Sequence, residues 1–185
     1  MAPQIIANTL KGLDVIRERS RGLVSFVESY RKFTHLPKPE KISFPMLPFL
    51  EKIRILVSSE PDFETTQFRI EVQPEEMHLI ADEKLISQVV INLVRNALQS
   101  LDARSNARIV LKACFDANGH PVVEVIDNGP GIPIELQEQI FIPFFTTREN
   151  GTGIGLSLSK QIMRLHGGSL RVNSRPGFTC FRMEF

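Results

Sequence analysis

Residues 82–101, DEKLISQVVINLVRNALQSL, are the stretch that decides the fold. Apolar residues recur along it at helical spacing and form one wide stripe. The stripe consists of Leu85, Ile86, Val89, Val90, Leu93, Val94, Ala97, Leu98 and Leu101. Asp82 precedes it and has the short acidic side chain that caps helix N-termini. We therefore expect a long helix here, with one face packed into a core.

A second face of this helix carries amide side chains, because Gln88, Asn92 and Asn96 recur every four residues. Asparagine is a poor helix former, since its side chain competes for backbone hydrogen bonds. One interpretation is a solvated polar face. The other is that the amide oxygens of Asn92 and Asn96 point at one spot, where they would suit Mg²⁺.

A first glycine loop, DNGPGI over residues 127–132, follows an apolar run that is typical of a buried strand. A bare Asp-Asn-Gly is usually only a turn. Here Gly129 and Gly131 also allow something flat or charged to approach the backbone closely. The carboxylate of Asp127, at the end of the strand, could accept a hydrogen bond from an exocyclic amine such as that of adenine.

A second glycine loop, GTGIGL over residues 151–156, leads directly into a predicted helix. Alternating glycines before a helix form a nest of amide groups at its positive end, which favours phosphate. The loop is not a Walker motif, because no Gly-Lys-Ser/Thr follows. It also lacks the spacing of the dinucleotide fingerprint.

Between the two loops lies a phenylalanine-rich stretch, FIPFFTTR over residues 141–148. Clustered phenylalanines more often belong to a core than to a functional site. In this irregular part of the chain they could instead anchor a hinged flap. Arg148, at the end of the stretch, could then reach a phosphate.

The rest of the chain alternates between short helices and strands. Periodicity predicts helices over residues 3–34, 45–58 and 156–166, and strands over 41–44, 68–72, 77–81, 107–115, 121–127, 169–173 and 178–185. Pro37 and Pro39 predict a linker after the first helix. The order is α+β with antiparallel hairpins rather than a repeating βαβ array.

Composition narrows the choice of function. Hydrophobic residues make up 42% of the 185, which is enough for a core. A net charge of +1 gives no electrostatic case for nucleic acid. Two cysteines are too few for a disulfide framework, and no run is long enough for a membrane span. We expect a cytoplasmic chain, whose parent could be anchored in a membrane by other segments.

The four motifs, in this order, resemble the N box, first glycine box, F box and second glycine box of the sensor histidine kinases. These two-component proteins share the Bergerat fold with DNA gyrase, Hsp90 and MutL proteins. The resemblance implies a two-layer α/β sandwich with a mixed sheet, preceded by one long helix. Residues 1–36 would be the second helix of an incomplete dimerisation and histidine-phosphotransfer domain, and residues 37–185 the ATP-binding domain.

The resemblance also implies roles for individual residues. Asn96 would bind Mg²⁺, and Asn96 and Arg148 would be catalytic. Asp127 would hold the adenine amine, with Thr179 near the base. The further residues implied to bind ATP are Asn92, Gly129, Gly131, Ile132, Thr146, Thr147, Gly151, Thr152, Gly153, Ile154, Gly155 and Leu156. The natural partners would be a response regulator and a second copy in the full-length protein.

Two departures from the family pattern bear on the reaction. None of His35, His78, His120 and His166 lies in the phosphoacceptor motif, so the γ-phosphoryl group would pass to a histidine elsewhere. Where related ATPases carry a catalytic glutamate this chain has Asn92, an amide that is no base. The alternatives are a Bergerat-fold ATPase, an anti-sigma type serine kinase and a nucleotide-binding scaffold without catalysis.

Overall fold

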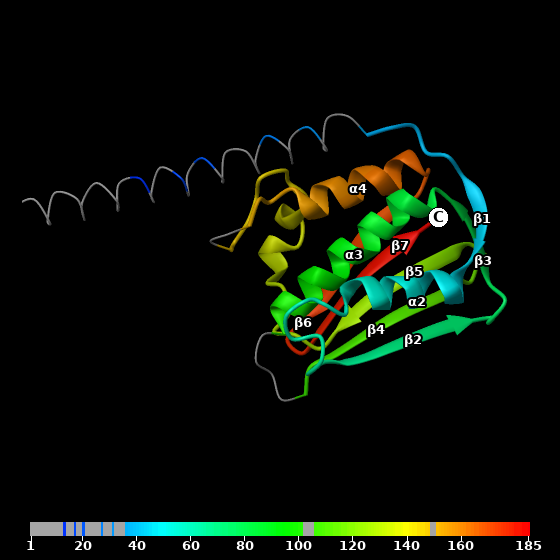
Figure 1. The fold of residues 1–185 in the computed structure, drawn as a ribbon, viewed down its shortest axis with the longest axis horizontal. Helices are drawn as coiled ribbons and strands as arrows, with labels where there is room; N and C mark the ends of the chain where they lie inside the picture. Colours follow the sequence, from blue (N-terminus) through cyan, green and yellow to red (C-terminus); the bar gives the residue numbers. More distant parts are fainter. Residues whose placement is uncertain are drawn as a thin grey trace, which may run out of the picture.

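Three helices cover one face of a five-stranded mixed sheet in the computed structural model of the protein (Figure 1). The structure describes residues 36–101, 106–148 and 151–185, with five scattered positions upstream. Apart from those five positions, the predicted helix over residues 3–34 lies outside the described residues, and the division of the chain at residue 36 stays a prediction.

The main sheet has the strand order β2-β4-β5-β7-β6. Its strands are β2 (Gln67–Gln73), β4 (Arg108–Phe115), β5 (Pro121–Asp127), β7 (Phe178–Glu184) and β6 (Ser169–Arg175). β2 and β4 are parallel, and every other pair is antiparallel. A separate antiparallel pair joins β1 (Ile42–Pro45) to β3 (His78–Ala81).

The core lies between this sheet and the helices α2 (Met46–Val57), α3 (Glu83–Ser100) and α4 (Gly155–Leu165) (Figure 1). The whole predicted apolar stripe of α3 is buried. Alternate residues of β4, namely Ile109, Leu111 and Ala113, meet the helices from the other side. The predicted α+β class, with a mixed sheet packed on helices, is therefore confirmed.

The opposite face of the sheet carries charged side chains at its centre, beside apolar ones such as Val122 and Cys180. Lys112, Glu124 and Arg182 lie side by side in the register of β4, β5 and β7. Arg182 Nη1 lies 2.7 Å from Glu124 Oε1, and Lys112 Nζ lies 4.0 Å from Glu124 Oε2. These charges keep this face in contact with water, so the domain has two layers rather than three.

The start of α3 is held by the predicted cap and by a buried histidine. Asp82 Oδ1 accepts the backbone N–H groups of Lys84 and Leu85, both at 3.0 Å. Burial raises the pKa of Asp82, but its backbone hydrogen bonds and the nearby His166 outweigh this, so the pKa falls below its ordinary value. His166, buried at the end of α4, accepts the Asp82 N–H at Nε2. His166 is therefore a structural link between α3 and α4.

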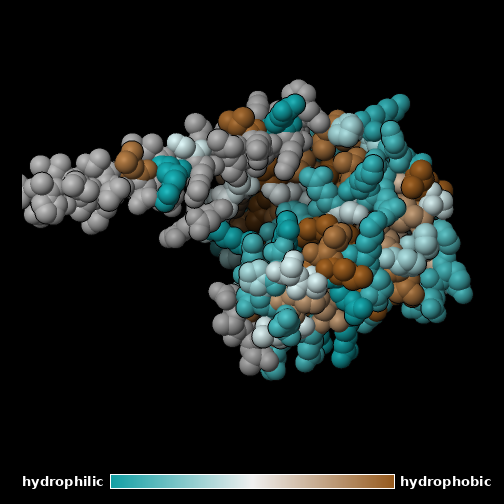
Figure 2. Space-filling model, in the orientation of Figure 1, coloured by the Kyte–Doolittle hydropathy of each residue, from teal (hydrophilic) through white to brown (hydrophobic). Residues whose placement is uncertain are grey.

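Two short 3-10 helices, η1 (Ile134–Leu136) and η2 (Gln139–Phe141), lie in the irregular part of the chain between the two glycine loops. The surface in the view of Figure 2 is largely hydrophilic, with apolar patches over α2 and over the β1–β3 pair. The exposed apolar residues of these elements are Ile42, Ile55, Leu56 and Ile80. In the part of the chain that the structure describes, none of the helices combines the length and apolarity of a membrane span.

Candidate functional site

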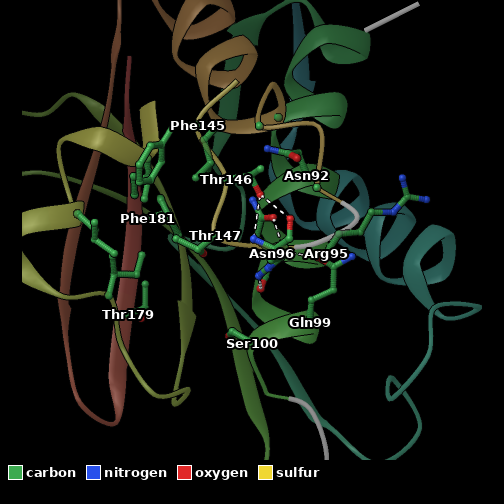
Figure 3. A pocket seen from close by; sticks show the side chains of 18 of the residues that line it. Asn92, Arg95, Asn96, Gln99, Ser100, Phe145, Thr146, Thr147, Thr179 and Phe181 are labelled. Atoms are coloured by element: carbon green, nitrogen blue, oxygen red, sulfur yellow. Dashed lines mark hydrogen bonds between the residues drawn. The ribbon is translucent and has the colours of Figure 1, made fainter. Parts of the chain in front are cut away.

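A cavity of about 950 Å³ opens between α3, the start of α4, the ends of β5 and β7, and the loops that join them (Figure 3). Its volume is in the range of small-molecule sites. Fourteen of the sixteen predicted site residues line it: Asn92, Asn96, Asp127, Gly131, Ile132, Thr146, Thr147, Arg148, Gly151, Thr152, Gly153, Gly155, Leu156 and Thr179. Residues from all four motifs thus meet in one place.

Asp127 and Thr179 form the sheet side of the cavity. They are direct partners in the register of β5 and β7, so their side chains lie on the same face of the sheet. Each is only 4% exposed. Asp127 Oδ1 accepts the N–H of Gly129 at 2.8 Å. A buried carboxylate beside a hydroxyl group suits a ligand that offers a hydrogen-bond donor.

The first glycine loop is fastened to β6 beside this pair. The Ile132 N–H donates to Ser174 Oγ at 2.8 Å, and Ser174 Oγ lies 2.9 Å from Thr179 Oγ1. Gln137 Nε2 donates to the carbonyl oxygens of Ile132 and Ser174, both at 2.9 Å. The loop is therefore tied to β6 by hydrogen bonds through Ser174 and Gln137.

Gly131 allows the first glycine loop to lie close to β6. Its φ is +85°, and a Cβ atom there would lie 2.5 Å from the carbonyl oxygen of Arg175. The close approach that the sequence suggested for this glycine is thus made to the β6–β7 turn of the protein itself. A side chain would both strain the backbone and push the loop off β6.

Gly129 and Ile154 are the two predicted residues that do not line the cavity. The Gly129 carbonyl accepts the N–H of Gly177 at 3.0 Å, which ties the loop to the β6–β7 turn. Ile154 is buried in the hydrophobic core just before α4. Gly129 therefore anchors the first glycine loop and Ile154 the second, although neither residue lines the cavity.

Asn92 joins α3 to α4 at the opposite side of the cavity (Figure 3). Its Nδ2 donates to Ser159 Oγ at 3.0 Å. A Cβ atom at Gly155 would collide with the Asn92 amide oxygen. Gly155 is therefore needed for the close contact between the first turn of α4 and α3.

Asn96 is in contact with a cation. Arg148 Nη1 donates to Asn96 Oδ1, and Arg148 Nη2 donates to the Asn96 carbonyl oxygen, both at 3.3 Å. Nη1 also donates to Gln99 Oε1. Burial lowers the pKa of the Arg148 guanidinium from its ordinary value. The amide oxygen predicted to bind a metal thus faces a positive group in the cavity.

The second glycine loop rests on the phenylalanine-rich stretch. The Phe144 N–H donates to the Gly153 carbonyl at 2.9 Å, and a Cβ atom at Gly153, where φ is +65°, would collide with the Phe144 main chain. Among the described residues no side chain caps α4, whose first turn begins at Gly155. The positive end of this helix favours an anion in the cavity.

The core interpretation of the phenylalanine-rich stretch holds for Phe141, whereas two later phenylalanines lie at the surface or at the cavity. Phe141 packs against the core, with its ring centroid 6.5 Å from that of Phe181. Phe144 is 43% exposed and Phe145 lines the cavity. Residues 149 and 150, which directly follow this stretch, lie outside the described part of the chain, and the hinged flap stays a prediction.

Comparison with known proteins agrees with this geometry. Residues 81–185 match the family described as "Histidine kinase-, DNA gyrase B-, and HSP90-like ATPase". The chain belongs to this family. Within it, the chain resembles the ATP-binding catalytic domains of sensor kinases.

Three histidine kinases illustrate the likeness. The chain is 38% identical to the signal transduction histidine-protein kinase AtoS of Escherichia coli (strain K12), over 70% of this chain and 21% of AtoS. It is 32% identical to the sensory histidine kinase/phosphatase NtrB of Rhodobacter capsulatus, over 99% of this chain and 56% of NtrB. The solved catalytic domain of ThkA aligns with a TM-score of 0.70 and 33% identity, over 79% of this chain and 95% of that one. A structure of ThkA with the response regulator TrrA aligns at 28% identity and a TM-score of 0.73, over 95% and 50%.

The chain thus spans about a fifth of AtoS and about half of NtrB. What it shares with these kinases is the ATP-binding catalytic domain of the histidine kinase-like ATPase family. The predicted identity as a sensor-kinase domain that binds ATP is therefore confirmed.

Some residues of this ATP-binding domain were not among the predicted site residues but line the cavity, among them Arg95, Gln99, Ser100, Phe145 and Phe181. Helical spacing from the two asparagines could have found the three on α3, because residues three or four apart share a face. Phe181 lies two residues after Thr179, on the same face of β7. Although Arg95 lines the cavity, its guanidinium points away from it, and its Nε donates to Glu60 Oε1 at 2.8 Å (Figure 3).

Proposed function

We propose that this ATP-binding domain transfers the γ-phosphoryl group of ATP to a histidine outside the four of this chain, for signalling to a response regulator. The observation that carries the proposal is the arrangement of one cavity. Its sheet side presents the buried Asp127 and Thr179, and its helix side presents Asn96, Arg148 and the start of α4. A donor-bearing base and a polyanion can thus be held at once.

Asp127 would select adenine. Its carboxylate can only accept hydrogen bonds, and the exocyclic amine of adenine is a donor. Guanine presents a carbonyl oxygen at the same place, which would face the carboxylate with acceptor against acceptor. Leaving such buried groups unpaired discriminates strongly between ligands. We therefore expect preference for ATP over GTP.

Mg²⁺ would bind at Asn96, with Asn92 as a second amide nearby. The residues fit a hard cation, because Asn96 Oδ1 faces the cavity and accepts a hydrogen bond from a guanidinium group. When bound, Mg²⁺ offsets the charge of the phosphates. The amide groups at the start of α4, at Gly153 and Gly155, would orient the phosphates, and Arg148 would add a second positive charge.

The acceptor histidine would come from a phosphotransfer domain. His78, His120 and His166 do not line the cavity, and His166 is committed to the link between α3 and α4. Residues 1–36 would supply the second helix of that domain, and residues 37–185 the catalytic part. The alignment with NtrB covers 99% of this chain, so that kinase has a counterpart of the segment before the catalytic part as well. The full-length protein would form a homodimer.

The response regulator is proposed by analogy with ThkA, whose structure includes the regulator TrrA. Asn92 argues against rapid hydrolysis, because an amide cannot accept a proton from water as a glutamate can. We therefore expect phosphoryl transfer to a protein rather than release of phosphate.

The test supplies a histidine-bearing phosphotransfer domain, fused before residue 1, with γ-labelled ATP and Mg²⁺. We expect label that is stable in alkali and labile in acid, as for phosphohistidine, and its loss in Asp127→Asn. Nucleotide binding without transferred label would favour the scaffold. Steady phosphate release without any acceptor would favour the ATPase.

A further inference from the structure

Two positive groups compete for the side-chain oxygen of Asn96. The structure gives it the guanidinium of Arg148, at 3.3 Å from Nη1. The proposed function gives it Mg²⁺. The two cannot share it, because a guanidinium within hydrogen-bond distance would lie within a few ångströms of the ion and the like charges would repel. The residues that hold Arg148 on Asn96 must therefore influence the binding of the metal.

Gln99 is the side chain that completes this hold. It lies three residues after Asn96 on α3, so the two side chains share one face of the helix. Arg148 Nη1 donates to both of their amide oxygens, and Nη2 donates to the Asn96 carbonyl. One planar guanidinium thus meets three oxygens of α3, in a fork that a lysine could not reproduce.

The C-terminal end of α3 also favours a cation at the position of the Arg148 guanidinium. The last turn of this helix carries no basic residue of its own. The carbonyl groups of a helix C-terminus attract cations, and here Arg148 supplies the cation from another part of the chain. The contact is at the surface, so its strength is modest and it can be reversed.

We propose, resting on the proposed function, that Gln99 is a positioning residue that holds Arg148 on Asn96 and so opposes the binding of Mg²⁺ with nucleotide. Release from Gln99 and Asn96 frees the amide oxygen for the metal and the guanidinium for the phosphates. Gln99 therefore sets how much Mg²⁺ the domain requires.

The test titrates Mg²⁺ into the whole chain at a fixed ADP concentration and follows ADP binding by calorimetry. We expect Gln99→Leu, which keeps the size and helix propensity of the side chain, to lower the half-effective Mg²⁺ concentration about threefold to tenfold. In an Arg148→Ala background the same substitution should have no effect, because nothing remains to be held. Gln88→Leu is the matched control, because Gln88 is also exposed on α3 but does not line the cavity.

Each outcome decides between the two proposals. If the wild-type chain binds ADP with Mg²⁺ and Gln99→Leu leaves the Mg²⁺ requirement unchanged or raises it, the role of Gln99 is refuted while the proposed function stands. An equal effect of Gln99→Leu with and without Arg148 also refutes it. If the wild-type chain does not bind ADP at all, the proposed function itself fails.

Discussion

The two sides of the cavity are built in different ways. The sheet wall is defined as Asp127, Ile132 and Thr179, which line the cavity, with Gln137 and Ser174, which do not. Hydrogen bonds tie Ile132, Gln137, Ser174 and Thr179 together, and Asp127 accepts the N–H of Gly129 in the same loop. The helix wall, defined as Asn96, Gln99 and Arg148, is tied together by one guanidinium group at the surface. Asp127 and Thr179 are buried, whereas Gln99 and Arg148 are exposed.

The difference indicates that the two walls have different roles in binding. The hydrogen bonds of the sheet wall are part-buried or, at Asp127, buried, and such bonds are costly to leave unmade, so we expect this wall to keep its shape on binding. Contacts of exposed charged groups are worth little, so the helix wall can exchange partners. Recognition of the base would therefore be preformed, while the contacts to phosphate and metal are made on binding.

The largest effect is expected for Asp127→Asn, which tests whether the sheet wall dominates recognition. The variant replaces an acceptor-only group with an amide that can turn a donor toward the adenine amine. A hydrogen bond to a charged group contributes about 1.5 to 3 kcal/mol, so ADP and AMP should both bind roughly 10- to 100-fold more weakly by calorimetry. Asp116→Asn, in the exposed β4–β5 turn, is the control. Unchanged affinity in Asp127→Asn would remove the basis for base selection.

Gly131→Ala tests whether the sheet wall is rigid. Both φ strain and the collision with Arg175 should lower the free energy of unfolding, by about 1 to 3 kcal/mol. The control is Gly119→Ala, because Gly119 has a similar φ of +82° but nothing within 4 Å of the added Cβ atom. Denaturant unfolding should show a larger loss at Gly131 than at Gly119. Equal losses of unfolding free energy in the two variants would mean that the first glycine loop moves to accommodate the Cβ atom, and that the sheet wall is not rigid.

Asn96→Ala tests whether the two walls contribute independently to nucleotide binding. It removes the side-chain oxygen proposed for Mg²⁺ but leaves the sheet wall intact, so the affinity for ADP with Mg²⁺ should fall about tenfold. AMP lacks the β-phosphate, and its affinity should change little. Calorimetry with each nucleotide, with and without Mg²⁺, measures this, and Asn173→Ala on the exposed face of β6 is the control. A matching loss for AMP would show that the walls are not independent.

Ser174→Ala probes the sheet wall more gently. It removes the acceptor for the Ile132 N–H, a loss of about 1 kcal/mol in the free energy of unfolding. ADP and AMP should weaken together, by about threefold, because the loop beside the base loosens. Thermal unfolding and calorimetry measure the two effects. A loss of affinity for ADP but not for AMP would contradict the assignment of Ser174 to the sheet wall.

The smallest effect on binding is expected for Asp82→Ala, which lies outside both walls but caps α3. Removal of an N-cap costs about 1 kcal/mol of stability. Because the folded pKa of Asp82 lies below its ordinary value, its stabilisation is present above the unfolded pKa and is lost as pH falls through the folded pKa. The stabilities of variant and wild type should therefore differ at neutral pH, begin to converge below about pH 4 and meet only below the folded pKa of Asp82. A constant difference down to pH 2 would contradict this.

The sequence predicted the elements well wherever local signals agreed. The stripe and cap of α3 predicted a helix that begins within one residue of Asp82, and strand β5 has the predicted bounds. The short helices η1 and η2 were missed, because three-residue turns leave no periodicity to detect. Within the site, the residues of continuous motifs were found, whereas Gln137 and Ser174 were not, since their role depends on a contact between distant segments.

What the sequence determined by itself is the set of local structures and the chemical groups available. Apolar spacing, a cap and glycines before a helix act over a few residues, and each can be interpreted without the rest of the chain. The tertiary structure alone decided which groups meet. Strand register placed Asp127 against Thr179, and packing at the end of α3 brought Arg148 to Asn96 and Gln99. Such contacts join residues roughly 50 positions apart, and the pairing that brings them together is set by the sheet and core as a whole rather than by any local pattern.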